Sequence, residues 1–345
     1  MSAGVVPRDV GAVVIARNEG ERLLACLDSL RGQVARIVYA DSASSDGSPE
    51  RARTHGAEVV VLDPARPLNA ARGRNAGLAR LMELHPELES VFFVDGDCRV
   101  EEGFLAAART ELARDPGLGA VCGRRRELAP EASLFNRAVD GEWNTPVGEA
   151  ETFGGDVLLR VRAVREAGGY DESMNQGEDP ELAFRVRRAG WRIRRIEHDM
   201  TWHDVALLRT SAWRRRHQRG GYAYAHGAAL HWREPGHYNQ RALLSILFWG
   251  LVLPLAVLLG FIPSGGFSLL LLAAYARPWR RVRASRLARG ESREHAARYA
   301  TLITLGKVDE AIGVLRCAWA LAIRREALIV EYKEYQRGAE RERAA

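Results

Sequence analysis

The first hundred residues alternate between short apolar runs and segments whose apolar residues recur at helical spacing. Residues 10–16, VGAVVIA, form a continuous apolar run, which is typical of a strand buried on both faces. Residues 19–30 follow with leucines at helical spacing, which predicts a helix that Gly32 can end. The pattern then repeats, predicting strands at 35–42, 57–63 and 90–95 and helices at 48–56 and 70–84.

This alternation of strand and helix predicts a mostly parallel α/β sheet that is covered by helices. In such sheets the ligand lies beyond the carboxyl ends of the strands. Polar residues stop three predicted strands at that edge, and we expect them to converge on one crevice: Asn18 with Glu19, Asp41, and Asp95. Beyond residue 100 the pattern turns mixed, with a helix expected at 102–114 and strands near 118–124 and 192–197.

A long apolar region follows, because the chain carries no charged residue from Ala242 to Ala276. As a helix, residues 242–262 would span about 30 Å, which matches the hydrocarbon core of a bilayer. PSGG at 263–266 predicts a turn, and residues 267–276 form a second, shorter apolar run. The region 242–276 is therefore expected to be a hydrophobic membrane hairpin.

Arginine-rich segments flank this region at 213–219 and 277–283, and such flanks favour the cytoplasmic side of a membrane. A hairpin with both ends in the cytoplasm would place both arginine-rich segments on the side that they favour. The second run is short for a full crossing, so a re-entrant, tilted or interfacial arrangement stays open, as does a buried helical pair in a soluble domain or dimer. Residues 226–241 would be a linker or interfacial segment, and 277–345 a cytosolic helical region.

The composition is that of an ordinary globular protein, because 47% of the 345 residues are apolar. The length suffices for one large domain with an appendage, or for two modest domains. The formal charge of +6 comes almost wholly from arginine, since Lys307 and Lys333 are the only lysines. Excess arginine permits contacts with phosphates or anionic membranes. No nucleic-acid partner is expected, because no binding module is recognisable and the acidic crevice would repel a phosphate backbone.

The cysteines and the N-terminus indicate a reducing compartment. The four cysteines are scattered without CxxC spacing, which disfavours a disulfide framework or a metal knuckle: Cys26, Cys98, Cys122 and Cys317. The opening residues MSAGVVPRDV contain no apolar segment of the kind that secretory signals carry, so no signal is expected there.

Asp95, Gly96 and Asp97 are the first candidate for chemistry. A glycine between two acids at the end of a strand lets the backbone turn, so that both carboxylates can face one point. Their oxygens suit a hard divalent cation, Mg²⁺ or Mn²⁺, which keeps open positions for phosphate oxygens. Asp-Gly is also typical of a tight turn. The position at a strand end favours the metal site without excluding the turn.

Two further segments carry groups that can bind a nucleotide. In YADSASSDGS, residues 39–48, Asp41 and the serines can hydrogen-bond the base and ribose of a nucleoside, although the same residues are typical of an Asx or Ser turn. In ARGRNAG, residues 71–77, Arg74 can bind a diphosphate through two hydrogen bonds. A single arginine on a helix is also typical of a solvated surface.

Asp179, Pro180 and Glu181 are typical of a helix start, with Asp179 as the N-cap and Pro180 at the first helical position. The same geometry can present Asp179 to a cleft as a general base for a hydroxyl nucleophile. An N-cap favours the ionised form, so we expect the pKa of Asp179 to be lowered and the base to be weak. His203 by itself is typical of a structural or surface histidine, but near two carboxylates it becomes a candidate metal ligand.

In their order along the chain, these segments resemble the motifs of family 2 glycosyltransferases with a GT-A fold. The resembling segments are VVIARNEGERL, DSASSDGS, ARGRNAG, VDGD, FGGDVLLRVRAVREAGGYDE and GEDPELAFRVRRAG. Single motifs are weak, but their shared order and spacing are fairly specific. The resemblance covers residues 10 to about 225 and implies a GT-A catalytic domain over 8–225, with a nucleotide-sugar half at 8–100 and an acceptor half at 101–225.

The resemblance also implies roles for individual residues. The nucleotide-sugar side would be formed by Ala16, Asn18, Glu19, Asp41, Arg74, Asp95 and Gly96. The metal, Mg²⁺ or Mn²⁺, would be bound by Asp95, Asp97 and His203, most directly by Asp97. Asp179 would be the catalytic base, and the acceptor side would be formed by Glu178, Gly154 and Gly155. Two departures stand out: Ala16 and Arg17 replace a frequent proline in the opening segment, and Glu181 stands where aspartate is common.

The implied reaction moves a sugar from a nucleotide diphosphate sugar to an acceptor hydroxyl, with a metal and with inversion, because one base carboxylate and no second nucleophile is identified. The apolar hairpin would place the enzyme in the cell inner membrane among membrane lipids, with its catalytic domain cytoplasmic. A lipid-linked glycan is then the expected acceptor, in cell-surface polysaccharide or glycolipid synthesis. The alternative is a catalytically silent GT-A-like domain that binds a nucleotide sugar or scaffolds a membrane complex.

Overall fold

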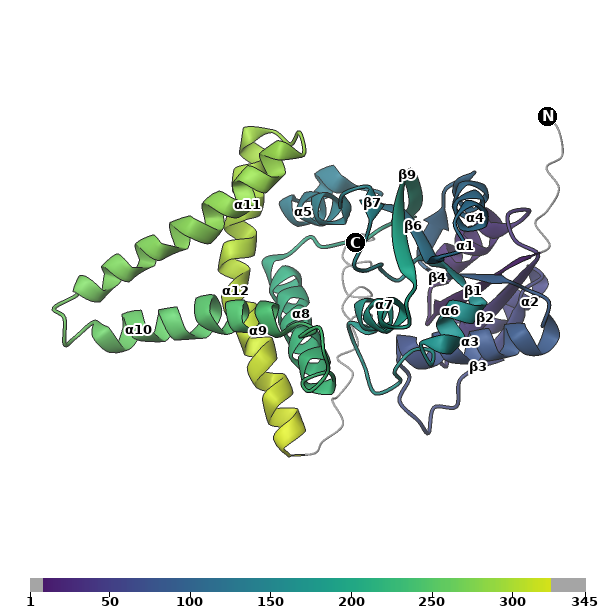
Figure 1. Ribbon diagram of the computed structural model, residues 1–345, viewed down its shortest axis with the longest axis horizontal. Helices are drawn as coiled ribbons and strands as arrows, with labels where there is room; N and C mark the ends of the chain where they lie inside the picture. Colours follow the sequence, from purple (N-terminus) through teal and green to yellow (C-terminus); the bar gives the residue numbers. More distant parts are fainter. Residues whose placement is uncertain (1–8, 324–345) are drawn as a thin grey trace. The chain divides into compact units, whose positions relative to one another are not determined.

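The structure is a computed structural model that describes residues 9–323. Within that range the chain divides into two compact units, which are described separately (Figure 1). The sheet unit contains residues 9–132 and 139–206, and the helical unit contains residues 133–138 and 207–323. The division at residue 206 precedes the expected domain limit at 225, and α8 (Thr210–Leu230) runs through that limit. The expected domain limits stay predictions.

The first half of the sheet unit has the predicted alternation of strands and helices. The strands are β1 (Val10–Ala16), β2 (Arg36–Asp41), β3 (Glu58–Val61) and β4 (Ser90–Asp95). The helices are α1 (Glu21–Leu30), α2 (Ser48–Thr54) and α3 (Ala70–Leu84). Neighbouring strands here are parallel, and the register pairs Ala16 with Asp41 and Ile15 with Asp95. The carboxyl ends of three strands therefore lie side by side, as the sequence predicts.

The second half adds antiparallel strand pairs to the sheet. Its strands are β5 (Cys98–Val100), β6 (Leu118–Glu127), β7 (Gly148–Glu149), β8 (Val157–Arg160) and β9 (Arg192–His203). Its helices are α4 (Phe104–Arg114), the 3₁₀ turn η1 (Pro130–Ala132), α5 (Leu134–Trp143), α6 (Val161–Glu166) and α7 (Glu178–Arg188). The strand order is β3-β2-β1-β4-β8-β6-β9-β5, with β7 on β9. β8 is antiparallel to β4 and β6, whereas β9 runs parallel to β6.

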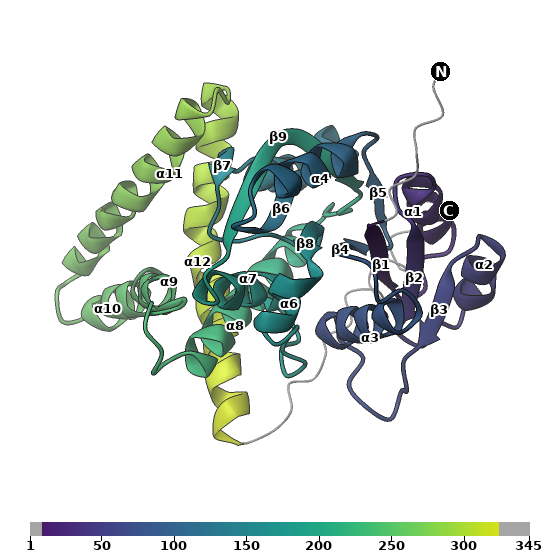
Figure 2. The same ribbon diagram turned by 45° about the vertical axis from the view of Figure 1, so that its right-hand side comes forward.

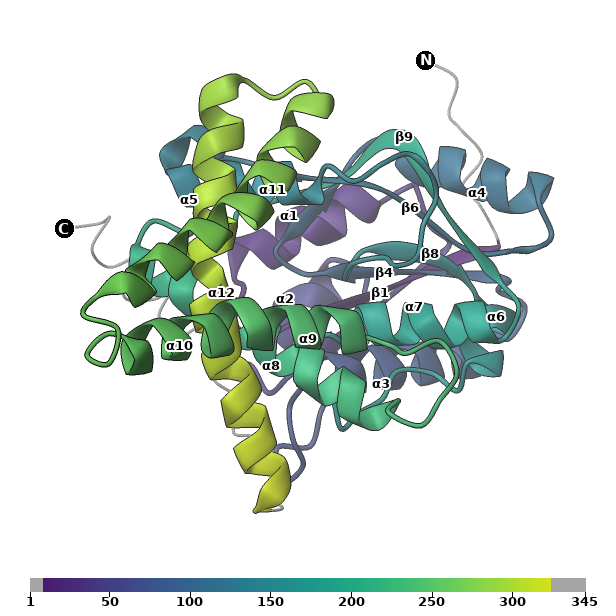
Figure 3. The ribbon, with the colours of Figure 1, turned by 60° about the vertical axis from the view of Figure 1, so that its left-hand side comes forward.

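Helices cover both faces of this sheet, which explains the continuous apolar runs in its strands. Figure 3 shows α4 on one face and α3, α6 and α7 on the other. Val13, Phe92 and Phe93 are fully buried between these layers. Figure 2 shows β3, β2, β1 and β4 side by side in the sheet.

The helical unit is built on the long helix α12 (Arg293–Ala322), against which α8 packs. Its other elements are α9 (Gln240–Leu247), the π-turn η2 (Phe248–Val252), α10 (Leu253–Gly260), the 3₁₀ segment η3 (Phe267–Tyr275) and α11 (Ala276–Ala288). Polar contacts join α8 to α12: Arg214 pairs with Asp309 at 3.1 Å, and His217 with Glu310 at 3.2 Å. The last 22 residues of the predicted helical region, 324–345, lie outside the described residues.

The predicted apolar hairpin is present as a pair of helical arms (Figure 1). Residues Gln240–Gly260 form one continuous helix of 21 residues, long and apolar enough to cross a membrane by length and composition, and only 22% of its apolar window is buried. Pro254 follows the π-turn, which suits a residue that lacks a backbone donor. The second arm folds back on the first, because the Ser268 hydroxyl donates to the Val257 carbonyl at 2.8 Å.

Candidate active site

The loops that follow β1 and β2 are held together by hydrogen bonds. Asn18 has a left-handed backbone, with φ of 56°, and its amide N–H donates to Ser44 Oγ at 2.8 Å. Its side-chain Oδ1 accepts the N–H of Ser45 at 2.8 Å. Glu19 next to it is 4% exposed and pairs with Arg22 at 2.7 Å. Asn18 and Glu19 therefore shape the rim of the predicted crevice, next to buried Ala16 at the end of β1.

Asp41 ends β2 and is fully buried. It accepts the hydroxyl of Tyr39 and, at 2.8 Å, the N–H of Ser44. Burial and the hydrogen bond to Asp41 raise the pKa of Tyr39, so this phenol keeps its proton and remains a donor. Asp41 thus organises the turn that Asn18 also contacts. Its expected contact with a nucleoside stays a prediction.

Asp95 ends β4 and is held between two arginines. Its Oδ1 lies 2.9 Å from Nη2 of Arg74, and its Oδ2 lies 3.1 Å from Nη2 of Arg125. Both carboxylate oxygens are therefore engaged by guanidinium groups from different elements, α3 and β6. The predicted role of Asp95 as a metal ligand stays untested, but its charge is already balanced within the protein.

Arg74 is the most enclosed cation of the site, with 2% of its side chain exposed. Besides Asp95, its Nη1 lies 2.7 Å from Glu178 and 3.5 Å from Asp179, and its guanidinium lies 5.3 Å from the ring centre of Tyr170. Burial opposes its charge, but Asp179 and Asp95 raise the pKa of Arg74, so it stays charged. The alternative of a solvated surface arginine is therefore wrong for Arg74. Its expected contact with a diphosphate stays a prediction.

Two residues of this cluster, Arg125 and Asp156, were not singled out from the sequence. Asp156 is fully buried; it pairs with Arg125 at 2.7 Å and also accepts the Thr201 hydroxyl. Arg125 thereby bridges Asp95 and Asp156. The available signal was Asp156 itself, an acid directly after the Gly154-Gly155 pair, whereas Arg125 sits in a run of three arginines that resembles a solvated strand edge.

Asp97 and His203 are brought together by the sheet register. Antiparallel pairing of β5 with β9 places Cys98 opposite His203, so Asp97 lies next to the imidazole. Asp97 Oδ2 lies 3.4 Å from His203 Nε2. Burial lowers the pKa of His203, but the charge of Asp97 outweighs it and the net shift is upward. Nδ1 of His203 is buried and has no hydrogen-bond partner among residues 9–323.

This donor set suits a divalent cation, because one carboxylate and one imidazole offer hard and borderline ligand atoms. Ligand atoms of Asp97, Cys98 and His203 lie within 4.8 Å of one another. Burial raises the pKa of the Cys98 thiol well above its usual value, so Cys98 is a neutral thiol there. Like the other three cysteines it is free and buried.

Gly96 lies in the turn between β4 and β5, as the sequence predicts, and its expected contact with the nucleotide sugar stays a prediction. Its backbone is not left-handed; instead it passes close to β1, and a Cβ at this position would lie 2.6 Å from Cβ of Ala16. Its N–H donates to the Ile15 carbonyl at 2.8 Å. The glycine therefore allows β1 and the Asp95–Asp97 turn to approach closely.

Asp179 lies in the first turn of α7 and is not its N-cap, so that prediction is wrong. The helix begins at Glu178, and Gly177, with φ of 80°, is the N-cap. Asp179 is therefore carried into the cluster, where 14% of its side chain is exposed. Burial, with the charge of Glu178, raises the pKa of Asp179 to about 8 despite Arg74. The expected lowering is wrong as well, because desolvation outweighs the opposing charge of Arg74.

Gly154 and Gly155 precede β8 and differ sharply in their surroundings. A Cβ on Gly155 would lie 2.7 Å from Asp95 Oδ2 and 2.8 Å from Arg74 Nη2, whereas a Cβ on Gly154 would meet nothing within 4 Å. We expect Gly155→Ala to displace the Asp95–Arg74 pair and to lower the activity of this site about a hundredfold. Gly154→Ala is the matched control and should retain activity. Equal rates for the two variants would contradict this placement.

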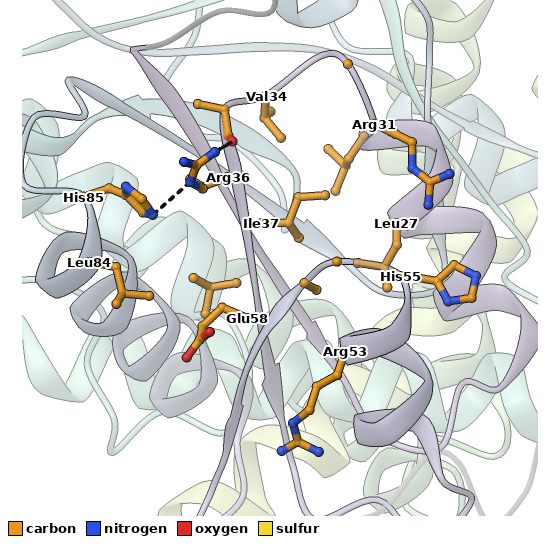
Figure 4. Close-up of a pocket in the computed structure, with 16 residues that line it drawn as sticks. Leu27, Arg31, Val34, Arg36, Ile37, Arg53, His55, Glu58, Leu84 and His85 are labelled. Carbon is orange, nitrogen blue, oxygen red and sulfur yellow. Dashed lines mark hydrogen bonds between the residues drawn. The ribbon is translucent and has the colours of Figure 1, made fainter.

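A separate hollow of about 620 Å³ lies at the opposite edge of the sheet, where β2 begins (Figure 4). It is rich in cationic side chains, but these are already paired. Arg36 donates to His85 at 3.0 Å, and Arg53 lies 3.5 Å from Glu50. The hollow is remote from the carboxyl ends of the strands, so the acidic cluster remains the candidate active site.

Comparison with known proteins identifies the fold and the family. Residues 12–153 match the family model described as glycosyl transferase family 2. Residues 90–281, more than half of the chain, match the model of glycosyl transferase family group 2. The chain belongs to the family 2 glycosyltransferases. It is therefore an enzyme of the glycosyltransferase class, as the motifs predict.

Several known proteins and solved structures are similar to this glycosyltransferase. It is 27% identical to the succinoglycan biosynthesis protein ExoA of Rhizobium meliloti, over 71% of this chain and 81% of that protein. It is 28% identical to the pre-mycofactocin glycosyltransferase of Mycobacterium tuberculosis, over 59% of this chain and 44% of that protein, so it spans less than half of that relative.

Among solved structures, the mannosyltransferase PcManGT of Pyrobaculum calidifontis, determined with GDP-Man and Mn²⁺, has a TM-score of 0.57 at 20% identity. That likeness covers 91% of this chain and 88% of the other. S. aureus TarS 1-349 has a TM-score of 0.51 at 14% identity, over 88% and 90% of the two chains. Both confirm the GT-A fold of this glycosyltransferase.

Proposed function

We propose that this glycosyltransferase moves a sugar from a nucleotide diphosphate sugar to an acceptor hydroxyl, with a divalent metal and with inversion. The observation that supports it is one cluster at the carboxyl edge of the sheet: Asp97 beside His203, and buried Asp179 joined to Asp95 through Arg74. A catalytically silent domain is not favoured, because the family is one of transferases and the acids of the site are present together.

Asp97 and His203 are the residues that would hold Mg²⁺ or Mn²⁺. Their ligand atoms are close together, and the buried Nδ1 of His203 lacks a partner among the described residues. Asp95, by contrast, is turned to two arginines. A bound cation supplies charge stabilisation to a departing diphosphate. PcManGT, which shares the fold, was solved with Mn²⁺ and GDP-Man, and this supports the same class of donor here.

Asp179 would accept the proton of the acceptor hydroxyl. A carboxyl whose pKa is raised to about 8 is a stronger base than an exposed aspartate. Glu178 would fix Arg74, which in turn fixes Asp95 and orients Asp179. With one base and no second carboxylate assigned as nucleophile, a single displacement inverts the anomeric carbon. The anomer of the product, read by NMR, tests this; retention would refute the assignment of Asp179.

The loops after β1 and β2 would hold the nucleoside, with Asn18 and Asp41 setting their shape. Gly155 would face the acceptor next to Asp95, whereas a Cβ on Gly154, expected on the same side, would meet nothing within 4 Å. The role of ExoA in succinoglycan biosynthesis, given by its name, supports a polysaccharide or lipid-linked glycan as the acceptor.

We further propose that the apolar hairpin inserts into the cell inner membrane with the sheet unit in the cytoplasm. The helix Gln240–Gly260 supports insertion, since its apolar side chains are mostly uncovered. Leu258, Leu259 and Ile262 are 69%, 73% and 87% exposed, which is costly in water. Carbonate extraction of isolated membranes tests this part, because release into the supernatant would exclude insertion.

The donor and the metal can be tested together. We expect one of UDP-, GDP- or dTDP-sugars to raise the melting temperature only when Mn²⁺ or Mg²⁺ is present, and to support transfer. Asp97→Ala should remove that metal-dependent shift and lower transfer at least about a hundredfold. Asp28→Ala is the control, because Asp28 is exposed on α1 and pairs with Arg31 on the surface. A metal-dependent shift that survives Asp97→Ala would refute this metal site.

A further inference from the structure

A cationic groove lies within the helical unit at the base of the apolar hairpin. It has a volume of about 660 Å³ and lies between α9 with η2, α11 and α12. Four basic side chains line it, and none of the residues that line it is acidic: Arg277, Arg281, Arg286 and Lys307. The same groove is lined by Phe248, Trp249 and Ile303, so its walls combine positive charge with apolar surface.

Two of the four cations have acidic partners outside the groove. Arg286 lies 3.3 Å from Glu291 and 3.8 Å from the ring centre of Tyr299, and Lys307 lies 2.6 Å from Glu310. Arg277 and Arg281 are exposed, one helical turn apart on α11, and neither has an ion pair among residues 9–323. The groove therefore carries an uncompensated positive charge at its α11 side, which favours an anion.

The groove continues into the apolar surface of the hairpin. Phe248 both lines the groove and is 46% exposed. Exposed apolar side chains extend from it along both arms: Leu244, Val252, Leu255, Leu258, Leu270 and Leu271. A ligand that satisfies the whole surface needs an anionic group next to a long apolar chain, because a free anion would leave the apolar walls in water.

We propose that this groove binds the phosphate headgroup of an anionic lipid, with the lipid chains along the hairpin. Arg277 and Arg281 hold the phosphate oxygens through charge-assisted hydrogen bonds, which a guanidinium makes well. This inference rests on the proposed insertion of the hairpin, and it adds a specific lipid site to that general membrane contact. Such a site would fix the depth of the hairpin, since the phosphates lie at the membrane surface.

The test uses the full chain in neutral detergent micelles, titrated with phosphatidylglycerol or phosphatidylcholine. We expect phosphatidylglycerol to bind at least about tenfold more tightly, and Arg277→Ala/Arg281→Ala to abolish that preference. The control, Arg280→Ala/Arg283→Ala, removes the same charge from the same helix without changing a residue that lines the groove. This control should keep most of the preference for phosphatidylglycerol. Equal losses in the two double variants would overturn the site, since general surface attraction would then explain the preference.

Inorganic phosphate distinguishes a lipid from a soluble anion. We expect millimolar phosphate to leave phosphatidylglycerol binding unchanged, and effective competition by phosphate would overturn the lipid assignment. Carbonate extraction and sugar transfer, measured on the same preparations, report the proposed function separately. A protein that resists extraction and transfers sugar but shows no lipid preference would refute only the groove.

Discussion

Asp179→Asn is expected to lower sugar transfer by about 10²–10⁴-fold, which is the usual contribution of a general base. Donor binding should be unchanged, because Asp179 belongs to the acceptor side of the proposed site. The fold should also be unchanged: below pH 8 the buried carboxyl is already mainly protonated, and asparagine resembles that neutral form. The measurements are kcat/KM, the donor Kd and the unfolding midpoint of both proteins.

The pH dependence follows from the raised pKa of Asp179. Since this pKa is about 8 in the folded protein, the base form is scarce at lower pH, and kcat/KM should rise about tenfold per unit up to roughly pH 8 and then level off. The contribution of Asp179 to the free energy of unfolding changes in the opposite direction and falls as the pH rises. The folded state binds this proton more tightly than the unfolded state, so the stabilisation is complete below pH 3.8 and is lost as pH rises towards 8.

Two results would contradict this account of Asp179. One is a pH profile of kcat/KM that is flat between pH 6 and about 8. The other is an Asp179→Asn variant that unfolds at lower denaturant concentration than the wild type, since loss of activity would then reflect loss of structure. Asp28→Asn, an exposed change on α1, is the matched control and should alter neither quantity.

Arg74→Ala is expected to cost about 3–5 kcal/mol of stability, because it leaves the buried Glu178 carboxylate without its cation. Glu178 loses its guanidinium partner in this variant, whereas Asp95 keeps Arg125. Urea unfolding followed by circular dichroism measures the free energy. The variant should also be inactive, because loss of the positive charge raises the pKa of Asp179 further and frees Asp95 to turn.

The control for Arg74 is on the same helix. Arg80 pairs with Glu58 and Glu83 at the protein surface, so Arg80→Ala should leave the unfolding free energy nearly unchanged. In addition, Arg74→Ala/Glu178→Gln should recover part of the lost stability, since it removes one of the unpaired charges. If Arg74→Ala were as stable as Arg80→Ala, the buried Glu178 carboxylate would not depend on Arg74.

The order of elements in the first hundred residues could be predicted because it is encoded locally. Apolar runs such as residues 10–16 and leucine spacing such as that of α1 depend only on near neighbours. The mixed half of the sheet was harder, since β9 extends to His203 through pairing with β5 and β6, which are far away in the chain. The protonation of Asp179 was missed because desolvation depends on what packs around a carboxyl.

The sequence by itself determined the alternation of strands and helices, the acids at the strand ends, the apolar hairpin and the family. Each of these is a matter of residue type and spacing along the chain. The tertiary structure alone decided that Arg74 and Arg125 hold Asp95, that Asp97 meets His203, and that Gly177 rather than Asp179 caps α7. These outcomes depend on which distant side chains share a buried space, and only there do charge and desolvation set their chemistry.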